Sequence, residues 1–202
     1  MTYPPEPWNL QGQMYVSFWR VPPNRLPGEL PPGTQPLLLG GRGVVGTAWV
    51  IYEAGGDLAY NEVMATVLVR RGSRPAVCIT HIWVDSEPSL EGGRALWGIP
   101  KKRATFDLAT SPGLAADART AGGSIAATFR SGTHLPGVWP LRFTVTQLLH
   151  GRRKDTPVRC RSQLERATAH WEIDASGPLA WLRGHRPFLS LQLRDFQLRF
   201  GN

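Results

Sequence analysis

The chain has 202 residues, of which 42 % are hydrophobic and 19 % are charged, and this composition excludes an intrinsically disordered protein. It carries 23 basic and 15 acidic residues, a formal net charge of +8. No apolar run reaches the roughly 18 to 20 residues of a membrane span, and the first ten residues lack the pattern of a secretory signal. We therefore expect a soluble, cytoplasmic protein that does not associate with a membrane. The two cysteines, Cys78 and Cys160, lack the spacing of a metal or redox pair and are expected to be buried thiols.

Glycine and proline punctuate the chain: 22 Gly and 18 Pro fall between apolar runs with no repeat period, which favours a β-rich protein. Loose alternation predicts a first strand over residues 13–21, and a long proline-rich loop follows over 22–43. Three β-rich runs over 44–52, 59–70 and 76–84 are separated by turn-forming sequences, so we expect two consecutive hairpins. No shift in composition marks a boundary, and a single domain is expected over 1–202.

The strand pattern is interrupted at Ser86. This serine can cap a helix, Pro88 suits its first turn, and Gly98 is typical of its end, so a short helix is predicted. Pro100 then directs the chain into a strand that starts at Lys101. Further strands are predicted over 124–130, 141–150, 157–163, 166–173 and 188–200, with a possible helical turn over 179–183. The expected fold is mainly β: an antiparallel, closed or nearly closed barrel with one or two short helices.

Lysine is rare in this chain, yet two of its three lysines, Lys101 and Lys102, are adjacent. At the start of a strand their side chains point to opposite faces, so one can enter an apolar interior while the other stays in solvent. An ordinary lysine is neutral in only about one molecule in 2,500 at pH 7, and only the neutral amine can attack a carbonyl. Burial and a second ammonium both lower a lysine pKa. In the alternative interpretation, both lysines are solvated cations on an edge strand and prevent that strand from pairing with the edge of another sheet.

The residues around this pair match a known signature. Tyr60-Asn61-Glu62 is followed by Gly93-Arg94-Ala95-Leu96-Trp97-Gly98-Ile99-Pro100-Lys101-Lys102. This order and spacing resemble the acetoacetate decarboxylase family, with its Tyr-x-Glu strand and its Gly-Arg-Glu-x-x-(Gly/Ala)-aromatic-Pro-Lys-Lys segment. The resemblance is good from about residue 43 to 106 and weak elsewhere.

The resemblance implies a role for each matching residue. Lys101 is the amine that forms a Schiff base with a ketone, and Lys102 is the neighbour that helps to keep it neutral. Glu62 serves in proton transfer or polar positioning, although an outward-facing glutamate is the alternative. Arg94 braces the site from the helix, or makes a surface ion pair. The family's barrel and its dimers or larger oligomers are implied as well, so a homo-oligomer is expected.

Five residues are candidates for the pocket around Lys101. Tyr60, Trp97 and Ile99 lie within the two segments that match the family signature. Gln13 stands near the position of a family arginine that engages the substrate carboxylate, and Thr47 or a neighbour stands where the family has a second glutamate. The chain therefore lacks the family's arginine and its second glutamate. Both differences affect the recognition of a β-keto acid, whereas the lysine chemistry is kept.

The resulting hypothesis is a Schiff-base lyase that decarboxylates an acetoacetate-like β-keto acid through an iminium on Lys101. The same iminium supports an aldolase, dehydratase or cyclase acting on a ketone. A non-catalytic barrel that binds an apolar ligand is a further alternative, because the chain has eight tryptophans for an aromatic-lined cavity.

Other functional classes are not favoured. The basic stretch with Arg152, Arg153, Lys154, Arg159 and Arg161 is interrupted by Asp155 and has no interleaved aromatic residue, so we expect no nucleic-acid partner. The five histidines lack the spacing of zinc ligands, so no metal and no cofactor are expected.

Overall fold

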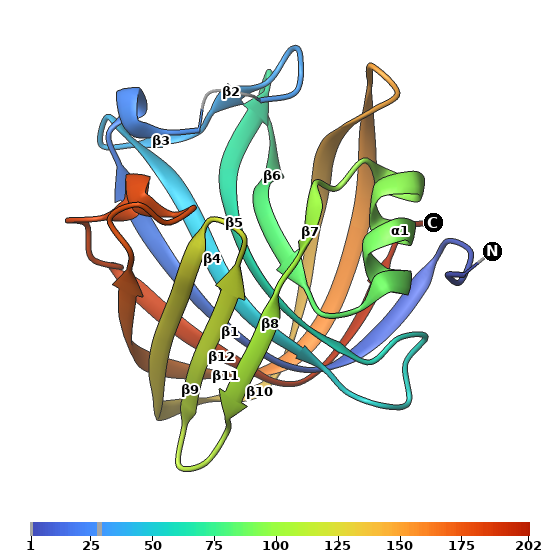
Figure 1. The fold of residues 1–202 in the computed structure, drawn as a ribbon. Coiled ribbons are helices and arrows are strands. Elements are labelled where there is room, and N and C mark those ends of the chain that lie inside the picture. The colour runs from blue at the N-terminus through green and yellow to red at the C-terminus, as the bar shows by residue number, and fades with distance from the viewer. Residues whose placement is uncertain (1, 28–29) are drawn as a thin grey trace.

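One sheet contains every β-strand of residues 2–27 and 30–202, the part of the chain that the computed structural model describes (Figure 1). Its strands are β1 (Trp8–Val21), β2 (Gln35–Pro36), β3 (Leu38–Leu39), β4 (Arg42–Tyr52), β5 (Tyr60–Arg71), β6 (Arg74–Val84), β7 (Lys101–Arg103), β8 (Thr105–Ala109), β9 (Leu114–Thr120), β10 (Gly123–Leu149), β11 (Arg152–Ile173) and β12 (Leu189–Phe200). The helical elements are α1 (Glu87–Trp97) and two 3₁₀ turns, η1 (Pro23–Arg25) and η2 (Ala180–Leu182). No helix among these described residues is long and apolar enough to cross a membrane.

The sheet curls into a nearly closed barrel. Its strand order is β7-β6-β5-β4-β1-β12-β11-β10-β9-β8, and β6 also meets β10 through the pair Val77 and Val145. That pairing closes a ring from β6 round to the second half of β10. Most pairings are antiparallel, while β6–β7 and β6–β10 are parallel. The mainly β, nearly closed barrel expected from the sequence is therefore confirmed.

The strands beyond the ring fold back over it. The first half of β10, then β9 and β8, cover the outer face of the barrel in Figure 1 and enclose a first core with residues such as Trp49, Phe129 and Trp171. A second core lies inside the ring. Strand β4 is thus buried on both faces, which explains why its residues from Val44 to Val50 are all buried and do not alternate between apolar and exposed polar side chains.

Helix α1 crosses one end of the barrel beside β7 (Figure 1). It begins as predicted: the Ser86 side chain accepts a hydrogen bond from the Ser89 amide at 3.3 Å, and Pro88 lies in the first turn. It ends at Gly98, whose φ of +67° is left-handed. A Cβ at Gly98 would lie 2.2 Å from the Leu148 carbonyl oxygen, so no other residue fits this close approach without a backbone shift.

Several strand boundaries differ from the prediction. Strand β1 begins five residues early, at Trp8, and the loop over 22–43 contains the short strands β2 and β3. Strand β9 was not predicted. The runs 124–130 and 141–150 are parts of one strand, β10, and 157–163 and 166–173 are parts of β11, because β-bulges let each strand bend without ending.

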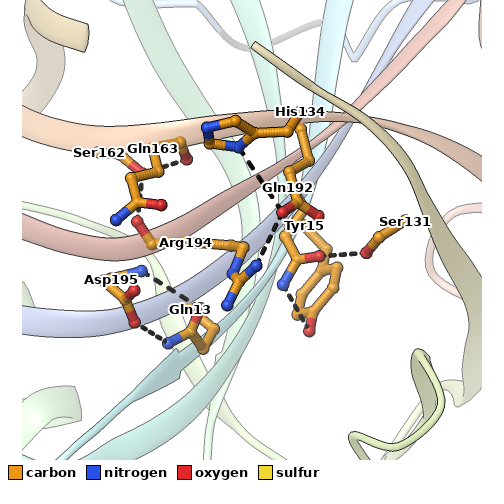
Figure 2. Close-up of polar contacts among 10 residues, drawn as sticks. Gln13, Tyr15, Ser131, His134, Ser162, Gln163, Gln192, Arg194 and Asp195 are labelled. Atoms are coloured by element: carbon orange, nitrogen blue, oxygen red, sulfur yellow. Dashed lines mark hydrogen bonds and ion pairs between the residues drawn. The ribbon is translucent and has the colours of Figure 1, made fainter. Parts of the chain in front are cut away.

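A polar network lies where these bulges bend the sheet (Figure 2). Glu165 accepts a hydrogen bond from the Arg194 guanidinium at 2.8 Å and lies 3.8 Å from the Nδ1 atom of His134. The Gln192 amide donates to the Tyr15 hydroxyl at 3.1 Å. The network joins β1, β10, β11 and β12 across the bend.

Candidate active site

Lys101 is the first residue of β7 and one of the most buried charged residues of the chain, with 3 % of its surface exposed. Its ammonium donates three hydrogen bonds: to Glu62 Oε2 at 2.9 Å, to Ser89 Oγ at 2.7 Å and to the Tyr60 hydroxyl at 3.2 Å. An ammonium has three donors, so this environment satisfies all of them. The geometry is that of a buried, fully paired lysine ammonium.

Strand β5 supplies two of these partners. Tyr60 and Glu62 are two residues apart and therefore share the face of β5 that looks into the barrel. Tyr52 on β4 is in register with Tyr60, and their rings lie 4.4 Å apart. The Tyr52 hydroxyl donates to Glu62 Oε1 at 3.3 Å, so each carboxylate oxygen has a hydrogen-bond donor.

Helix α1 holds Lys101 from the other side. Ser89 and Gly93 are one turn apart and share a face of the helix. The lysine side chain runs directly over Gly93, where a Cβ would lie 2.8 Å from its Cδ. Arg94 is exposed, and its Nε donates to the Lys101 main-chain carbonyl at 2.8 Å. Arg94 therefore braces the backbone of β7 and does not point at the ammonium.

Burial and charge act in opposite directions on Lys101. Burial lowers its pKa, but the Glu62 carboxylate and the Tyr60 hydroxyl together outweigh burial, so the pKa of Lys101 is raised above its ordinary value. Burial and the neighbouring Glu62 also raise the pKa of Tyr60 to about 12. In this structure Lys101 is thus a protonated partner of Glu62, whereas the family resemblance implied a depressed lysine pKa.

Lys102 lies on the opposite face of β7 and is exposed. Its charge acts on His81 of the neighbouring strand β6: burial and then Lys102 lower the pKa of that histidine. The alternation expected for the lysine pair is present. The contacts of Lys101 with Glu62 and Tyr60, and not the position of Lys102, dominate the electrostatics of the buried amine.

Lys101 closes one end of a cavity of about 430 Å³ inside the barrel. Trp97 and Ile99 line this cavity, as does Tyr60. Among the described lining residues Glu62 is the sole carboxylate. The remaining wall is mainly aliphatic and aromatic, which is the form of a small-molecule site with a few convergent polar groups.

The structure does not bring every sequence candidate to this end of the cavity. Thr47 lines the cavity, but its hydroxyl accepts a hydrogen bond from the Trp19 indole at 2.8 Å and is fully buried. Gln13 lies outside, in the bend shown in Figure 2, where its amide donates to Asp195 at 3.0 Å. Of the eight tryptophans, Trp8 and Trp97 line the cavity, and most of the others pack in the first core.

The family model for acetoacetate decarboxylase matches residues 1–165 of this chain. The chain belongs to the acetoacetate decarboxylase family. A curated acetoacetate decarboxylase from Ralstonia nicotianae is 31 % identical over 116 residues, which are 54 % of this chain and 43 % of that protein. The match to this curated relative therefore spans less than half of its length.

Solved structures of other proteins share the fold of this acetoacetate decarboxylase family member. An acetoacetate decarboxylase from Legionella pneumophila has a TM-score of 0.74 and 18 % identity, with all of this chain and 87 % of that chain covered. The enduracididine biosynthesis enzyme MppR, complexed with the condensation product of pyruvate and imidazole 4-carboxaldehyde, has a TM-score of 0.68 and 16 % identity. That comparison covers all of this chain and 89 % of MppR.

Two residues that contact Lys101 or Glu62 were not among the candidates from the sequence. Ser89, which contacts the ammonium, is four residues before Gly93, so helical spacing from the signature glycine could have found it. Tyr52, which contacts Glu62, could have been found by pairing the two strands of the hairpin at residues 52 and 60.

Proposed function

We propose that this protein is a Schiff-base lyase that decarboxylates a β-keto acid, with Lys101 as the amine that attacks the substrate ketone. The observation that carries the proposal is the buried Lys101 ammonium at the end of an apolar cavity, 2.9 Å from the Glu62 carboxylate. This arrangement pairs a nucleophile with a base that can take its proton.

The first step is a proton transfer along the existing hydrogen bond from Lys101 to Glu62. Burial favours the neutral pair over two charges, and this opposes the attraction that holds the ion pair. The free amine of Lys101 adds to the ketone carbon. The proton now on Glu62 passes to the departing hydroxyl, water leaves, and a protonated imine remains beside the Glu62 carboxylate.

The second step breaks the bond between the substrate's α-carbon and its carboxylate. The electron pair of that bond moves towards the iminium nitrogen, carbon dioxide departs, and a neutral enamine forms. One proton from the solvent, delivered by water directly or after it has been taken up by the Glu62 carboxylate, adds to the enamine carbon. Hydrolysis then frees the ketone and restores the Lys101 ammonium, so the net reaction consumes one β-keto carboxylate and one proton and yields a ketone and carbon dioxide.

The same enamine could add to a second carbonyl, eliminate water or cyclise, which makes an aldolase, dehydratase or cyclase the alternative function. The solved MppR complex with a condensation product is a fold relative of that kind. The wall beyond Lys101 favours decarboxylation, because its aliphatic side chains offer few polar groups to hold a second electrophile. An apolar wall also destabilises a carboxylate charge, which the loss of carbon dioxide removes.

Borohydride reduction followed by mass spectrometry tests the proposal, because it converts an imine into a stable secondary amine. With acetoacetate, the wild-type protein is expected to release carbon dioxide, and the peptide that contains Lys101 is expected to gain the isopropyl group that remains when the imine of the ketone product is reduced. Lys101→Ala should abolish both signals, and Lys102→Ala, on the opposite face, should retain them. Trapping without carbon dioxide but with a new carbon–carbon bond would support the alternative.

An absence of trapping with every ketone and keto acid would instead support the non-catalytic ligand-binding barrel. The further expectations are proposals too: a small ketone or β-keto acid as the sole ligand, no nucleic acid, no membrane, no cofactor, a cytoplasmic location and a homo-oligomer. Light scattering after size exclusion measures the oligomeric state directly, and a monomer at all concentrations would contradict the last of these.

A further inference from the structure

The cavity extends far beyond the groups that hold Lys101. Along β5 it is lined by every second residue from Glu62 to Leu68, six positions later. At about 3.3 Å per residue this stretch is roughly 20 Å long. Leu68 is in register with Val77 of β6, which also lines the cavity, so these two residues mark the end opposite to Lys101.

The volume is larger than a small keto acid needs. A water-sized group takes about 30 Å³, so 430 Å³ corresponds to roughly fourteen such groups. Acetoacetate has about half that number of non-hydrogen atoms. A substrate of that size would occupy the end near Lys101 and leave the remaining wall without a contact.

The wall beyond the Lys101 end is apolar on several strands. Its aliphatic and aromatic residues include Met14, Val16, Phe18, Met64, Leu68, Val77, Ile79, Leu141, Phe143, Leu164, Leu191 and Leu193. The two threonines at this level use their hydroxyls within the protein: Thr66 donates to the Gly46 carbonyl at 3.1 Å, and Thr47 accepts from Trp19.

Arg142 also borders the cavity, through its place on β10. Its neighbours Leu141 and Phe143 pair with Cys160 and Val158, which belong to the core inside the ring. Strand alternation therefore directs the Arg142 side chain to the outer face, in register with Arg159. The far part of the cavity is consequently suited to a hydrocarbon and not to a second anionic group.

We propose that the substrate is a 3-oxo acid with an extended apolar tail, whose ketone reaches Lys101 and whose tail lies along β5 towards Leu68 and Val77. This inference rests on the proposed Schiff-base function and adds the substrate class. Each methylene that moves from water into this wall is expected to raise kcat/KM about fourfold until the cavity is full.

A chain-length series tests the inference. We expect kcat/KM for carbon dioxide release to rise from 3-oxobutanoate through 3-oxohexanoate and 3-oxooctanoate to 3-oxodecanoate. Equal or falling values along the series would overturn the inference while leaving the proposed function intact. If no member of the series is decarboxylated or trapped, the proposed function itself fails.

Two variants test where the apolar tail of the substrate binds. Leu68→Trp narrows the far end and should lower the ratio of kcat/KM for 3-oxodecanoate to that for 3-oxobutanoate by at least about tenfold. Arg70→Trp places the same ring on the same face of β5, two residues further along and exposed, and should leave the ratio unchanged. An unchanged ratio in Leu68→Trp would place the tail elsewhere and overturn the proposal.

Binding without chemistry gives an independent measurement. In Lys101→Ala protein, 2-ketones of increasing length should bind with increasing affinity, followed by the fluorescence of Trp8 and Trp97 in the cavity wall. Affinity that does not depend on length would overturn the inference even if the wild-type protein forms the Schiff base.

Discussion

Burial of the Lys101–Glu62 ion pair lowers the free energy of unfolding. Two charges lose their hydration when they are buried, and a pair of this kind is often no more stable than apolar residues of similar volume. Its retention at the end of a cavity is therefore better explained by chemistry than by folding. The hydroxyls of Tyr52, Tyr60 and Ser89 limit the cost, because they satisfy the remaining donors and acceptors.

Removing one charge of the pair should therefore destabilise the protein more than removing both. Lys101→Met leaves the Glu62 carboxylate without its cation and should lower the free energy of unfolding by about 3–5 kcal/mol. The double variant Lys101→Met with Glu62→Gln removes both charges and keeps an acceptor for the two tyrosines, so it should recover most of that loss. Urea unfolding of the single and double variants measures the difference. A double variant less stable than either single variant would mean that the ion pair itself stabilises the fold.

Glu62 also sets the protonation of Lys101. In Glu62→Gln, burial acts without the opposing carboxylate, so the pKa of Lys101 should fall. More free amine is then present at neutral pH, and borohydride trapping should extend to lower pH even though carbon dioxide release slows through loss of the proton acceptor. The pH profile of trapping is the measurement, and an unchanged profile would show that Glu62 does not control the amine.

Lys102 has a separate, testable effect on stability. Burial and Lys102 hold the pKa of His81 below its ordinary value, so the unfolded chain binds a proton more readily than the folded one. The stability contribution is present above the unfolded pKa of about 6.5 and is lost as the pH falls from that value through the lower pKa of the folded protein. Lys102→Gln should raise the His81 pKa, seen in its NMR titration, and make acid unfolding less steep. No change in that titration would contradict the effect of the Lys102 charge on His81.

At the scale of elements, local signals predicted the parts of the site that lie close together in sequence. The cap at Ser86 and the glycine at 98 predicted the two ends of α1, and Pro100 predicted the strand that starts at Lys101. Strand β9 was missed because Leu114–Thr120 is rich in alanine and has few β-branched residues. Helical spacing and hairpin register place Ser89 and Tyr52 beside Gly93 and Tyr60. The contact of Ser89 with Lys101 also requires α1 to lie against β7, which a local pattern does not encode.

A substitution in helix α1 can test how the Lys101 side chain is positioned without lowering the stability of the fold. Gly93→Ala adds a methyl group 2.8 Å from Cδ of Lys101 and should displace the ammonium, so that borohydride trapping slows by about tenfold or more. Alanine favours helix over glycine by about 1 kcal/mol, so the melting temperature should not fall in parallel. Ala95→Ser on the exposed face is the control. Equal trapping in both variants would show that Gly93 is not needed to seat the lysine.

The barrel has a well-supported part, strands β4 and β5, and a less supported part, residues 130–144 of β10. Strands β4 and β5 are paired on both sides and buried between two cores, so they hold Tyr52, Tyr60 and Glu62 in fixed positions. Among the described residues, the barrel closes between β6 and β10 through one backbone pair, Val77 with Val145, and through the buried Gln147 amide, which donates to the Ile79 carbonyl at 3.0 Å. In the described chain β10 pairs with β9 only up to Phe129, so residues 130–144 have one partner strand, β11.

This asymmetry predicts the pattern of hydrogen exchange. Amides over 130–144 should exchange orders of magnitude faster than those of Val63 to Val67 in β5, because a strand with one free edge opens at lower free energy than a strand buried on both sides. Mass spectrometry of peptides after deuterium labelling measures both segments in one experiment. Strong protection of 130–144 that disappears on dilution would mean that a second copy covers the free edge, where Val138 and Trp139 are exposed. Protection that is equal in the two segments and independent of concentration would contradict the lower stability expected for residues 130–144.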